Sequence, residues 1–274
     1  NIGLYLYEHL KKNKNIINKR TNVDLVVKYV SAKNKFKKRR IKIPNKLWLK
    51  SYKEAYLKKD IDIVVEVIGG SEGIAKNLVY NSIKNKKHVV TANKALISRY
   101  GDELAYLAEQ KKVNLEYEAA VAGGVPIIRI LKEGLVANKI SKIYGILNGT
   151  SNFILSNMDK MTLDFKSVLN KAKNLGYAES NPISDLNGED VKSKIQILGA
   201  LAFNSFINKS KINVEGINNI DQTDIRNAEI LGYKIKHLGV AELENGKIIQ
   251  RVHPCLVKKD SYVSNVNDVL NAII

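Results

Sequence analysis

The sequence predicts an α/β fold that consists of a doubly wound parallel sheet and a second, α+β domain. Between residues 23 and 115, short runs of β-branched residues alternate with helical stretches, which is typical of a parallel sheet with helices on both faces. After Gly123-Gly124-Val125-Pro126 this alternation ends, and helices predominate. We therefore expect two domains, at residues 1–125 and 126–274.

The strands expected in the first domain are runs of valine and isoleucine. The clearest is Ile61–Ile68, because an almost continuous apolar run is typical of a strand buried on both faces. Gly69 and Gly70 end this strand, and Ser71 is a suitable N-cap for the helix that follows. The remaining elements expected here are strands at Val23–Val30, His88–Thr91 and Asn114–Ala119 and a helix at Asp102–Lys112.

The second domain is expected to contain mostly helices. They are expected at Ile127–Leu135, Ser151–Met158, Phe165–Leu175, Gly188–Phe203, Asp224–His237 and Val263–Ile274, with a strand at Ile140–Leu147. Leu238–Leu256 predicts two strands that turn at Glu244-Asn245-Gly246, because Asn-Gly is a frequent hairpin turn.

The composition excludes several classes of protein. A single cysteine, Cys255, excludes an internal disulfide framework and a multi-cysteine zinc site, which favours a reducing compartment. No apolar run is long enough to cross a bilayer and no signal peptide is visible, so we expect a cytoplasmic protein without a membrane partner. The formal net charge is +18, but the excess is mostly lysine spread along the chain, without a nucleic-acid-binding motif. We therefore expect no nucleic-acid partner.

The first residues fit the end of a dinucleotide-binding fingerprint, G-x-G-x-x-G, in which a strand leads into a helix whose N-terminus faces the pyrophosphate. Asn1-Ile2-Gly3 would be its last three residues, although any glycine before a helix would match as well. We interpret the chain as a fragment that lacks the first strand, with the other two glycines, and its C-terminal part. The expected strand at Val23–Val30 is followed by Ser31 and, further on, Arg40 rather than by an acidic residue, which favours NADP and leaves NAD open.

The segment from Gly176 to Lys194 carries residues suited to acid–base chemistry. A loop with Glu179 and Asp185 leads into a helix with Asp190 and Lys194. Residues four apart on a helix are neighbours, so we expect the last two to pair. A partly buried lysine held by a carboxylate is a suitable proton donor or acceptor at an alcohol–carbonyl centre. From the spacing alone, an exposed ion pair is the simpler interpretation.

Four blocks of residues together resemble the homoserine dehydrogenase family. Residues 176–194 are similar to its signature, in which G-Y-x-E, D-L-x-G-x-D and a lysine occur in this order. The other blocks are Val90–Leu96, Tyr117–Pro126 and Leu147–Leu155, in the order of the family. The resemblance implies a Rossmann-type cofactor domain followed by a domain for substrate binding and dimerisation. It also implies NAD(P)-dependent interconversion of L-aspartate 4-semialdehyde and L-homoserine, as in threonine, methionine and isoleucine synthesis.

The resemblance, together with the fingerprint, also gives individual residues a role. They are Lys194 and Asp190 for catalysis; Glu179, Asp185, Gly149 and Thr150 for substrate binding; Asn1, Ile2, Gly3, Arg40, Gly69 and Lys94 for cofactor binding; and Glu118, Val121, Gly123 and Val125 for a sodium ion. Carboxylates suit the ammonium of the substrate, a helix N-terminus suits its carboxylate, and main-chain oxygens suit a monovalent cation. The resemblance also implies a homodimer.

Two alternatives stay open. A non-catalytic or degenerate dinucleotide-binding paralogue would share the fold, and the absent glycines of the fingerprint keep this interpretation possible. Another oxidoreductase of amino-acid metabolism with the same cofactor domain would lack the set formed by Glu179, Asp185, Asp190 and Lys194.

Overall fold

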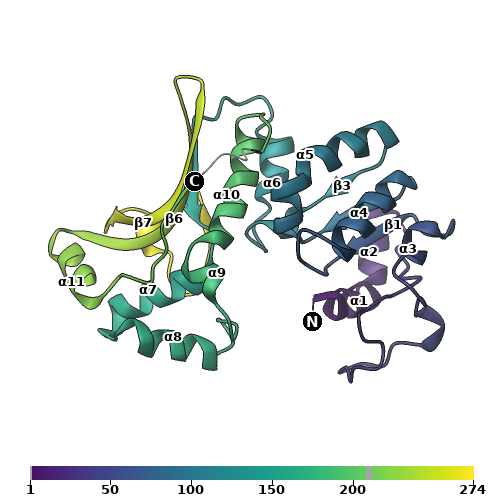
Figure 1. Ribbon diagram of the computed structural model, residues 1–274, viewed down its shortest axis with the longest axis horizontal. Helices are drawn as coiled ribbons and strands as arrows, with labels where there is room; N and C mark the ends of the chain where they lie inside the picture. Colours follow the sequence, from purple (N-terminus) through teal and green to yellow (C-terminus); the bar gives the residue numbers. More distant parts are fainter. Residues whose placement is uncertain (1, 208–211) are drawn as a thin grey trace. The chain divides into compact units, whose positions relative to one another are not determined.

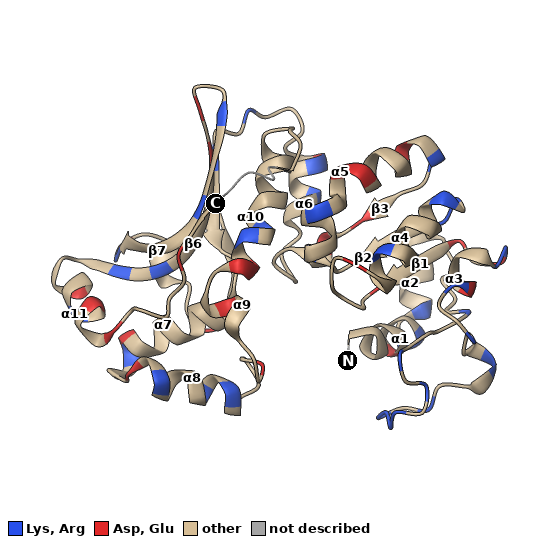
Figure 2. Ribbon diagram, in the orientation of Figure 1, with Lys and Arg blue, Asp and Glu red and all other residues tan. Residues whose placement is uncertain are grey.

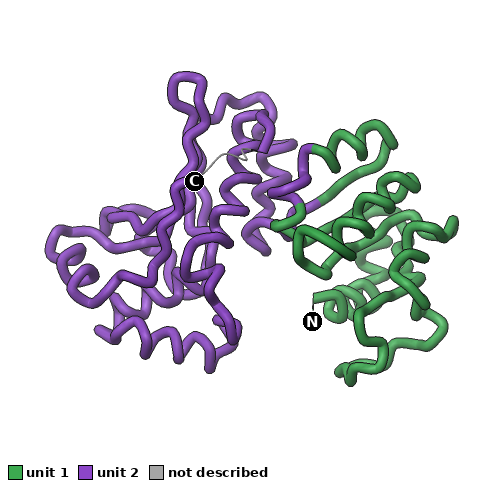
Figure 3. Tube along the Cα trace, viewed as in Figure 1, with its two compact units in different colours: residues 1–96, 103–116 green, residues 97–102, 117–274 purple. Residues whose placement is uncertain are grey.

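The computed structural model describes residues 2–207 and 212–274 (Figure 1). The chain divides into two compact units (Figure 3). The first unit comprises Asn1–Leu96 and Glu103–Glu116, and the second comprises Ile97–Asp102 and Tyr117–Ile274. The domain boundary expected between residues 125 and 126 stays a prediction. Within the described residues, no helix combines the length and hydrophobicity needed to cross a membrane.

The first unit contains a three-stranded parallel sheet with connecting helices, as the alternating pattern predicted. The strands are β1 (Ile63–Glu66), β2 (His88–Thr91) and β3 (Leu115–Glu116), side by side in that order. The helices are α4 (Ile74–Lys84) between β1 and β2, and α5 (Lys94–Lys111) between β2 and β3. Parallel neighbours need such crossovers. Side chains of α4, α5 and β2 form the buried core of this unit, among them Ile83, Val89 and Leu96.

Residues 23–30 do not form the expected strand. Only Val30 makes a bridge, to Trp48, and the Val26 side chain is 65% exposed. A strand requires a neighbour that supplies the hydrogen-bond ladder, and among the described residues this segment has only that bridge. The other elements before β1 are short: α1 (Ile2–Lys12), α2 (Lys14–Thr21), η1 (Asn45–Leu47) and α3 (Glu54–Leu57).

Three further boundaries of the first unit differ from the expectation. Ser71 does not cap α4, because Gly73, with a φ of 68°, occupies the N-cap position. α5 begins well before Asp102, because the side chain of Asn93 accepts a hydrogen bond from the Leu96 amide and caps the helix there. After β3 the chain forms the 3₁₀ helix η2 (Glu118–Ala120) instead of continuing as a strand.

The second unit contains a five-stranded mixed sheet in the order β5-β7-β6-β4-β8. The strands are β4 (Lys142–Ile146), β5 (Asn213–Val214), β6 (Tyr233–Glu244), β7 (Lys247–Lys258) and β8 (Ala272–Ile273). β6 and β7 form a long antiparallel hairpin. Its turn lies at Asn245 and Gly246, whose φ angles are 49° and 77°, and this confirms the predicted Asn-Gly turn.

Helices pack against this sheet and against one another. They are α6 (Ile127–Arg129), η3 (Ile130–Gly134), α7 (Gly149–Met161), α8 (Phe165–Asn174), α9 (Ile183–Leu186), α10 (Glu189–Ala202), α11 (Gln222–Ile230) and η4 (Val263–Asn265). Met158 of α7 and Val168 of α8 are fully buried in one apolar cluster. α10 crosses β6 at Gly239, where an added Cβ would lie 2.9 Å from the Val191 side chain. This glycine therefore allows α10 to lie close to the sheet.

Two helix predictions in the second unit are wrong in part. The helix expected at Asp224–His237 ends at Ile230, and after Gly232, with a φ of 81°, the chain enters β6. The helix expected at Val263–Ile274 is only the turn η4, and residues 272–273 pair with β4 as β8. In both cases pairing with a distant strand overrides the local helix preference.

Candidate active site

Lys194 of α10 is at the centre of the candidate site. Its Nζ lies 2.7 Å from Oδ2 of Asp190, one turn earlier in the same helix, and donates a hydrogen bond to the Leu147 carbonyl at 2.6 Å. The side chains of Lys194 and Asp190 are only 14% and 4% exposed. The pair is therefore not the exposed ion pair that the spacing alone suggested, and shielding from water strengthens it.

Asn148 connects this pair to a second carboxylate. Its Nδ2 donates to Asp185 Oδ1 and to Asp190 Oδ2, at 2.8 Å in each case. Its Oδ1 accepts from the Ser151 amide at 2.8 Å and so caps α7. The amide orientation follows from these partners, since only its nitrogen can donate to carboxylates. The lysine and both carboxylates thus belong to one network.

The start of α7 lies at this network and is closely packed. An added Cβ at Gly149 would lie 2.7 Å from the Val269 carbonyl oxygen. Thr150 donates through Oγ1 to the Tyr177 carbonyl at 2.8 Å, which ties the loop between α8 and α9 to the start of α7. The amides of residues 149 and 150 have no acceptor within the described part of the chain, so they are available to an anion. Glu179 is exposed on the same loop and, among the described residues, takes no part in the network.

His237 of β6 packs behind the start of α10. Its Nε2 lies 2.9 Å from the Glu215 carbonyl oxygen, and its ring would be 3.4 Å from a Cβ added at Gly188, the N-cap of α10. Burial lowers the pKa of His237 and so keeps the imidazole uncharged near neutral pH. The charge close to Asp190 is therefore supplied by Lys194.

In the first unit, a buried carboxylate holds the glycine turn after β1. Glu66 is fully buried, and its Oε1 accepts from the amides of residues 68 and 69 at 2.6 and 3.0 Å. Its Oε2 accepts from the Thr91 hydroxyl at 2.5 Å, and Asn93 donates to the Gly70 carbonyl at 2.7 Å. This edge, at the carboxyl ends of β1 and β2, is where parallel α/β sheets bind ligands.

The other cofactor candidates lie near the starts of helices. A Cβ added at Gly3 would lie 3.2 Å from Cγ2 of Val67, so α1 lies close to the end of β1, as expected of the third fingerprint glycine. Ile2 is the first residue of α1 and is 64% exposed, and Lys94 is the first residue of α5. Asn1 lies outside the described residues.

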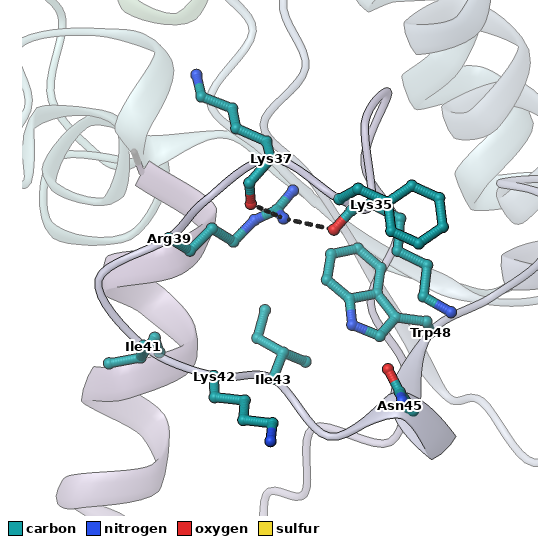
Figure 4. A pocket seen from close by; sticks show the side chains of 9 residues that line it. Lys35, Lys37, Arg39, Ile41, Lys42, Ile43, Asn45 and Trp48 are labelled. Atoms are coloured by element: carbon teal, nitrogen blue, oxygen red, sulfur yellow. Dashed lines mark hydrogen bonds between the residues drawn. The ribbon is translucent and has the colours of Figure 1, made fainter.

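Arg40 lies within a basic segment, residues 35–48, that lines a pocket in the first unit (Figure 4). The guanidinium of Arg39 lies 4.8 Å from the centre of the Trp48 ring and donates to three carbonyl oxygens of the loop at 2.7 to 2.8 Å, so it holds the backbone of the loop together. Arg40 forms an ion pair with Glu8 of α1, and its side chain is 59% exposed. Elsewhere, lysine and arginine are spread over the elements of both units (Figure 2).

Comparison with known proteins identifies the family. The model of the homoserine dehydrogenase family matches residues 126–274, and that of the homoserine dehydrogenase NAD-binding domain matches residues 1–118. The chain belongs to the homoserine dehydrogenase family. The expected α/β fold, with an NAD-binding domain built on a parallel sheet and a second domain built on a mixed sheet, is thereby confirmed.

Individual homoserine dehydrogenases are similar over much of the chain. That of Neisseria gonorrhoeae is 45% identical over 96% of this chain and 60% of its own length, and that of Pseudomonas aeruginosa is 47% identical over 78% and 49%. A crystal structure of the Staphylococcus aureus homoserine dehydrogenase superposes with a TM-score of 0.83 at 39% identity, covering 97% of this chain and 65% of that one. A hyperthermophilic archaeal homoserine dehydrogenase in complex with NADPH superposes with a TM-score of 0.69 at 26% identity, covering 81% of this chain and 64% of that one. The chain spans 60% or less of the length of the two curated relatives.

The loop that resembles the sodium site of homoserine dehydrogenases is held by Glu118. The two carboxylate oxygens of Glu118 accept from the amides of residues 128 and 129, both at 2.9 Å. Within the described residues no group donates to the carbonyl oxygens of Val121 and Gly123, which leaves hard oxygen donors of the kind a monovalent cation prefers. Among residues 2–207 and 212–274, no cluster of three or more histidine, cysteine or acidic side chains is suited to hold a metal ion.

Sequence reasoning missed Asn148, Glu66 and the Leu147 carbonyl. Asn148 had a detectable signal, because asparagine directly before a helix is a strong N-cap. Glu66 had one as well, since a carboxylate inside an apolar strand needs buried partners. The contact between Lys194 and the main chain of Leu147 had none, because any residue type supplies a carbonyl oxygen.

Proposed function

We propose that this protein catalyses the NAD(P)-dependent interconversion of L-homoserine and L-aspartate 4-semialdehyde. The observation that supports this most directly is the shielded pair of Lys194 and Asp190, joined through Asn148 to Asp185 at the start of α7. A degenerate dinucleotide-binding paralogue would have no use for these charged groups in a mostly buried network. Their intact geometry therefore favours an enzyme.

Lys194 is the residue that we propose to move the proton. Its ammonium has three N–H donors, of which one faces Asp190 and one binds the Leu147 carbonyl, so the third is left for the substrate oxygen. The nicotinamide, when bound, supplies or accepts the hydride at the aldehyde carbon. As the aldehyde is reduced, Lys194 donates a proton to its oxygen, and in the reverse direction it accepts the hydroxyl proton. The ion pair with Asp190 fixes the direction of the ammonium.

The remaining groups fit an amino-acid substrate. Asp185 uses one carboxylate oxygen for Asn148, and we assign the other to the substrate ammonium, together with the exposed Glu179. The unbonded amides of Gly149 and Thr150 would bind the substrate carboxylate. A neutral alcohol or aldehyde would gain nothing from these contacts.

We assign cofactor binding to the first unit. The start of α1 at Ile2 and Gly3, the glycine turn at Gly69 and the start of α5 at Lys94 would hold the dinucleotide, as would Asn1. Arg40 would bind the 2′-phosphate of NADP by exchanging its ion pair with Glu8 for the phosphate. The NADPH complex of the archaeal relative supports NADP, and NAD remains the second candidate.

A sodium ion and a homodimer are further parts of the proposal. The main-chain oxygens of Glu118, Val121, Gly123 and Val125 would hold the ion, and its charge would stabilise the turn that leads into α6. Two copies of the chain would associate as the family resemblance implies, which sedimentation velocity measures directly.

An assay with homoserine tests the proposed activity. The protein is mixed with L-homoserine and either NADP or NAD, and the absorbance of the reduced nicotinamide is followed. We expect reduction with at least one of the two cofactors. No reduction with either, while the dinucleotide still binds, would favour the degenerate paralogue.

A further inference from the structure

We infer that Asn148 is a positioning residue for proton transfer, because it sets the charge balance around Lys194. The inference rests on the proposed function. Asn148 is 6% exposed and donates hydrogen bonds to two carboxylates, Asp185 and Asp190, of which Asp190 pairs with Lys194. It acts through Asp185 and Asp190 and is not assigned a contact with the substrate.

The hydrogen-bonding capacity of the Asn148 side chain is fully used. Its Oδ1 accepts from both the amide and the hydroxyl of Ser151, at 2.8 and 2.9 Å. Its two N–H donors each reach one carboxylate, Asp185 and Asp190, at 2.8 Å. Turning the amide over would set its oxygen against two carboxylates and lose the cap of α7. The orientation is therefore fixed from both ends.

This arrangement gives each of the two carboxylates a hydrogen-bond donor that carries no charge. A hydrogen bond donated to a carboxylate favours its charged form, whereas two carboxylates without a donor between them would repel and favour protonation of one. An ionised Asp190 holds the Lys194 ammonium in place. Asn148 thus supplies two donors without adding a charge, which neither aspartate nor lysine could do at this position.

Several other titratable groups around α10 contact residues outside this network. His237 of β6 faces Asp190 but is kept uncharged by burial. Several charged side chains elsewhere on α10 and on the elements around it pair with other groups: Lys142 and Arg251 with Glu242, Lys192 with Glu189, Arg129 with Glu133, and Lys132 with the ring of Tyr117. A change of charge at residue 148 acts on Asp185 and Asp190, which it contacts, and through Asp190 on Lys194.

Two substitutions separate this role from capping. Asn148→Asp and Asn148→Ser both keep an oxygen that can cap α7. Asn148→Asp adds a third carboxylate to the network, so Lys194 should be harder to deprotonate than in the wild type. Asn148→Ser removes both amide N–H donors without adding charge, and kcat should fall about tenfold or more with cofactor affinity unchanged. Asp164→Ser, at the exposed N-cap of α8, is the matched control and should change neither quantity.

Two measurements test the effect of these substitutions on Lys194. NMR titration of ¹⁵N-labelled lysine follows Lys194 without any need for turnover, with Lys194→Arg to assign the signal. The pH profile of kcat/KM for homoserine oxidation should move to higher pH in Asn148→Asp. Titration of Lys194 at the wild-type pH in Asn148→Asp would overturn the inference. If that variant does not fold, unchanged kcat in a folded Asn148→Ser would overturn it instead. A wild-type protein inactive toward homoserine would refute the proposed function, and the NMR titration would still decide on Asn148.

Discussion

Replacing Lys236 by methionine tests how a buried charge affects the stability of the second unit. Lys236 of β6 is 1% exposed, and its ammonium donates to the Val266 carbonyl at 2.6 Å. Its other partners are the side-chain oxygens of Asn152, Ser156 and Asn267, at 3.3 to 3.4 Å. All four partners are uncharged. Burial lowers the pKa of Lys236 from 10.5 to about 8.

The sign of the resulting pH dependence follows from proton binding. Below about pH 8, Lys236 is charged in both states, and the folded protein bears the full cost of burying the charge. Between about pH 8 and 10.5 the unfolded chain binds the proton more tightly, so the free energy of unfolding increases with pH. The lowered pKa corresponds to about 3 kcal/mol over this window. Lys236→Met has no proton to release and lacks this increase.

Urea unfolding followed by circular dichroism at pH 7, 9 and 10.5 measures the effect. The difference in unfolding free energy between wild type and Lys236→Met should change by about 3 kcal/mol in favour of the wild type as the pH rises. Lys247→Met, an exposed lysine of the same hairpin, is the control and should show a difference that is nearly constant with pH. A constant difference for Lys236→Met as well, with equal m-values, would refute the reasoning.

Three further substitutions test the two sites. Asp190→Asn should lower kcat about a hundredfold or more with cofactor affinity retained, because the lysine loses its counter-charge; steady-state kinetics with normal turnover would contradict this. Gly149→Ala places a Cβ 2.7 Å from the Val269 carbonyl oxygen, so urea unfolding should show a loss of about 1–3 kcal/mol, and an unchanged midpoint would disprove the close contact. Glu66→Ala deprives the Thr91 hydroxyl and the glycine turn of their buried acceptor, so fluorescence titration should show weaker NADP binding, whereas equal affinity would exclude this role.

The sequence predicted those parts of the fold that depend on local pattern. The apolar run Ile61–Ile68 predicts a strand, which is confirmed as β1, but its expected burial on both faces is wrong, because Ile63 and Val65 are 45% and 40% exposed. The Asn245-Gly246 turn is predicted because its turn type needs positive φ. Residues 23–30 and 272–273 were assigned wrongly, because a strand depends on a partner that is distant in sequence. Local pattern carries no information about that partner.

In the candidate site, too, the sequence predicts the local pairing but not the contacts with distant residues. The pairing of Asp190 with Lys194 followed from helical spacing, but their low exposure depends on Gly239, which lets α10 lie close to β6. Asn148 hydrogen-bonds to Asp185 and Asp190, which lie 37 and 42 positions further along the chain, so no local sequence pattern predicts these contacts.

Proton exchange between Lys194 and the oxygen of the substrate is the central step of the proposed reaction. The most direct measurement is kcat for homoserine oxidation, together with the dissociation constant of the cofactor, in Lys194→Ala and in Lys192→Ala. Lys192 lies on the same helix and pairs with Glu189 at 3.1 Å, away from the network. We predict that Lys194→Ala lowers kcat about a thousandfold while cofactor affinity stays within about twofold of wild type, and that Lys192→Ala changes neither. Equal losses of turnover and cofactor affinity in Lys194→Ala, or turnover close to that of wild type, would contradict the account.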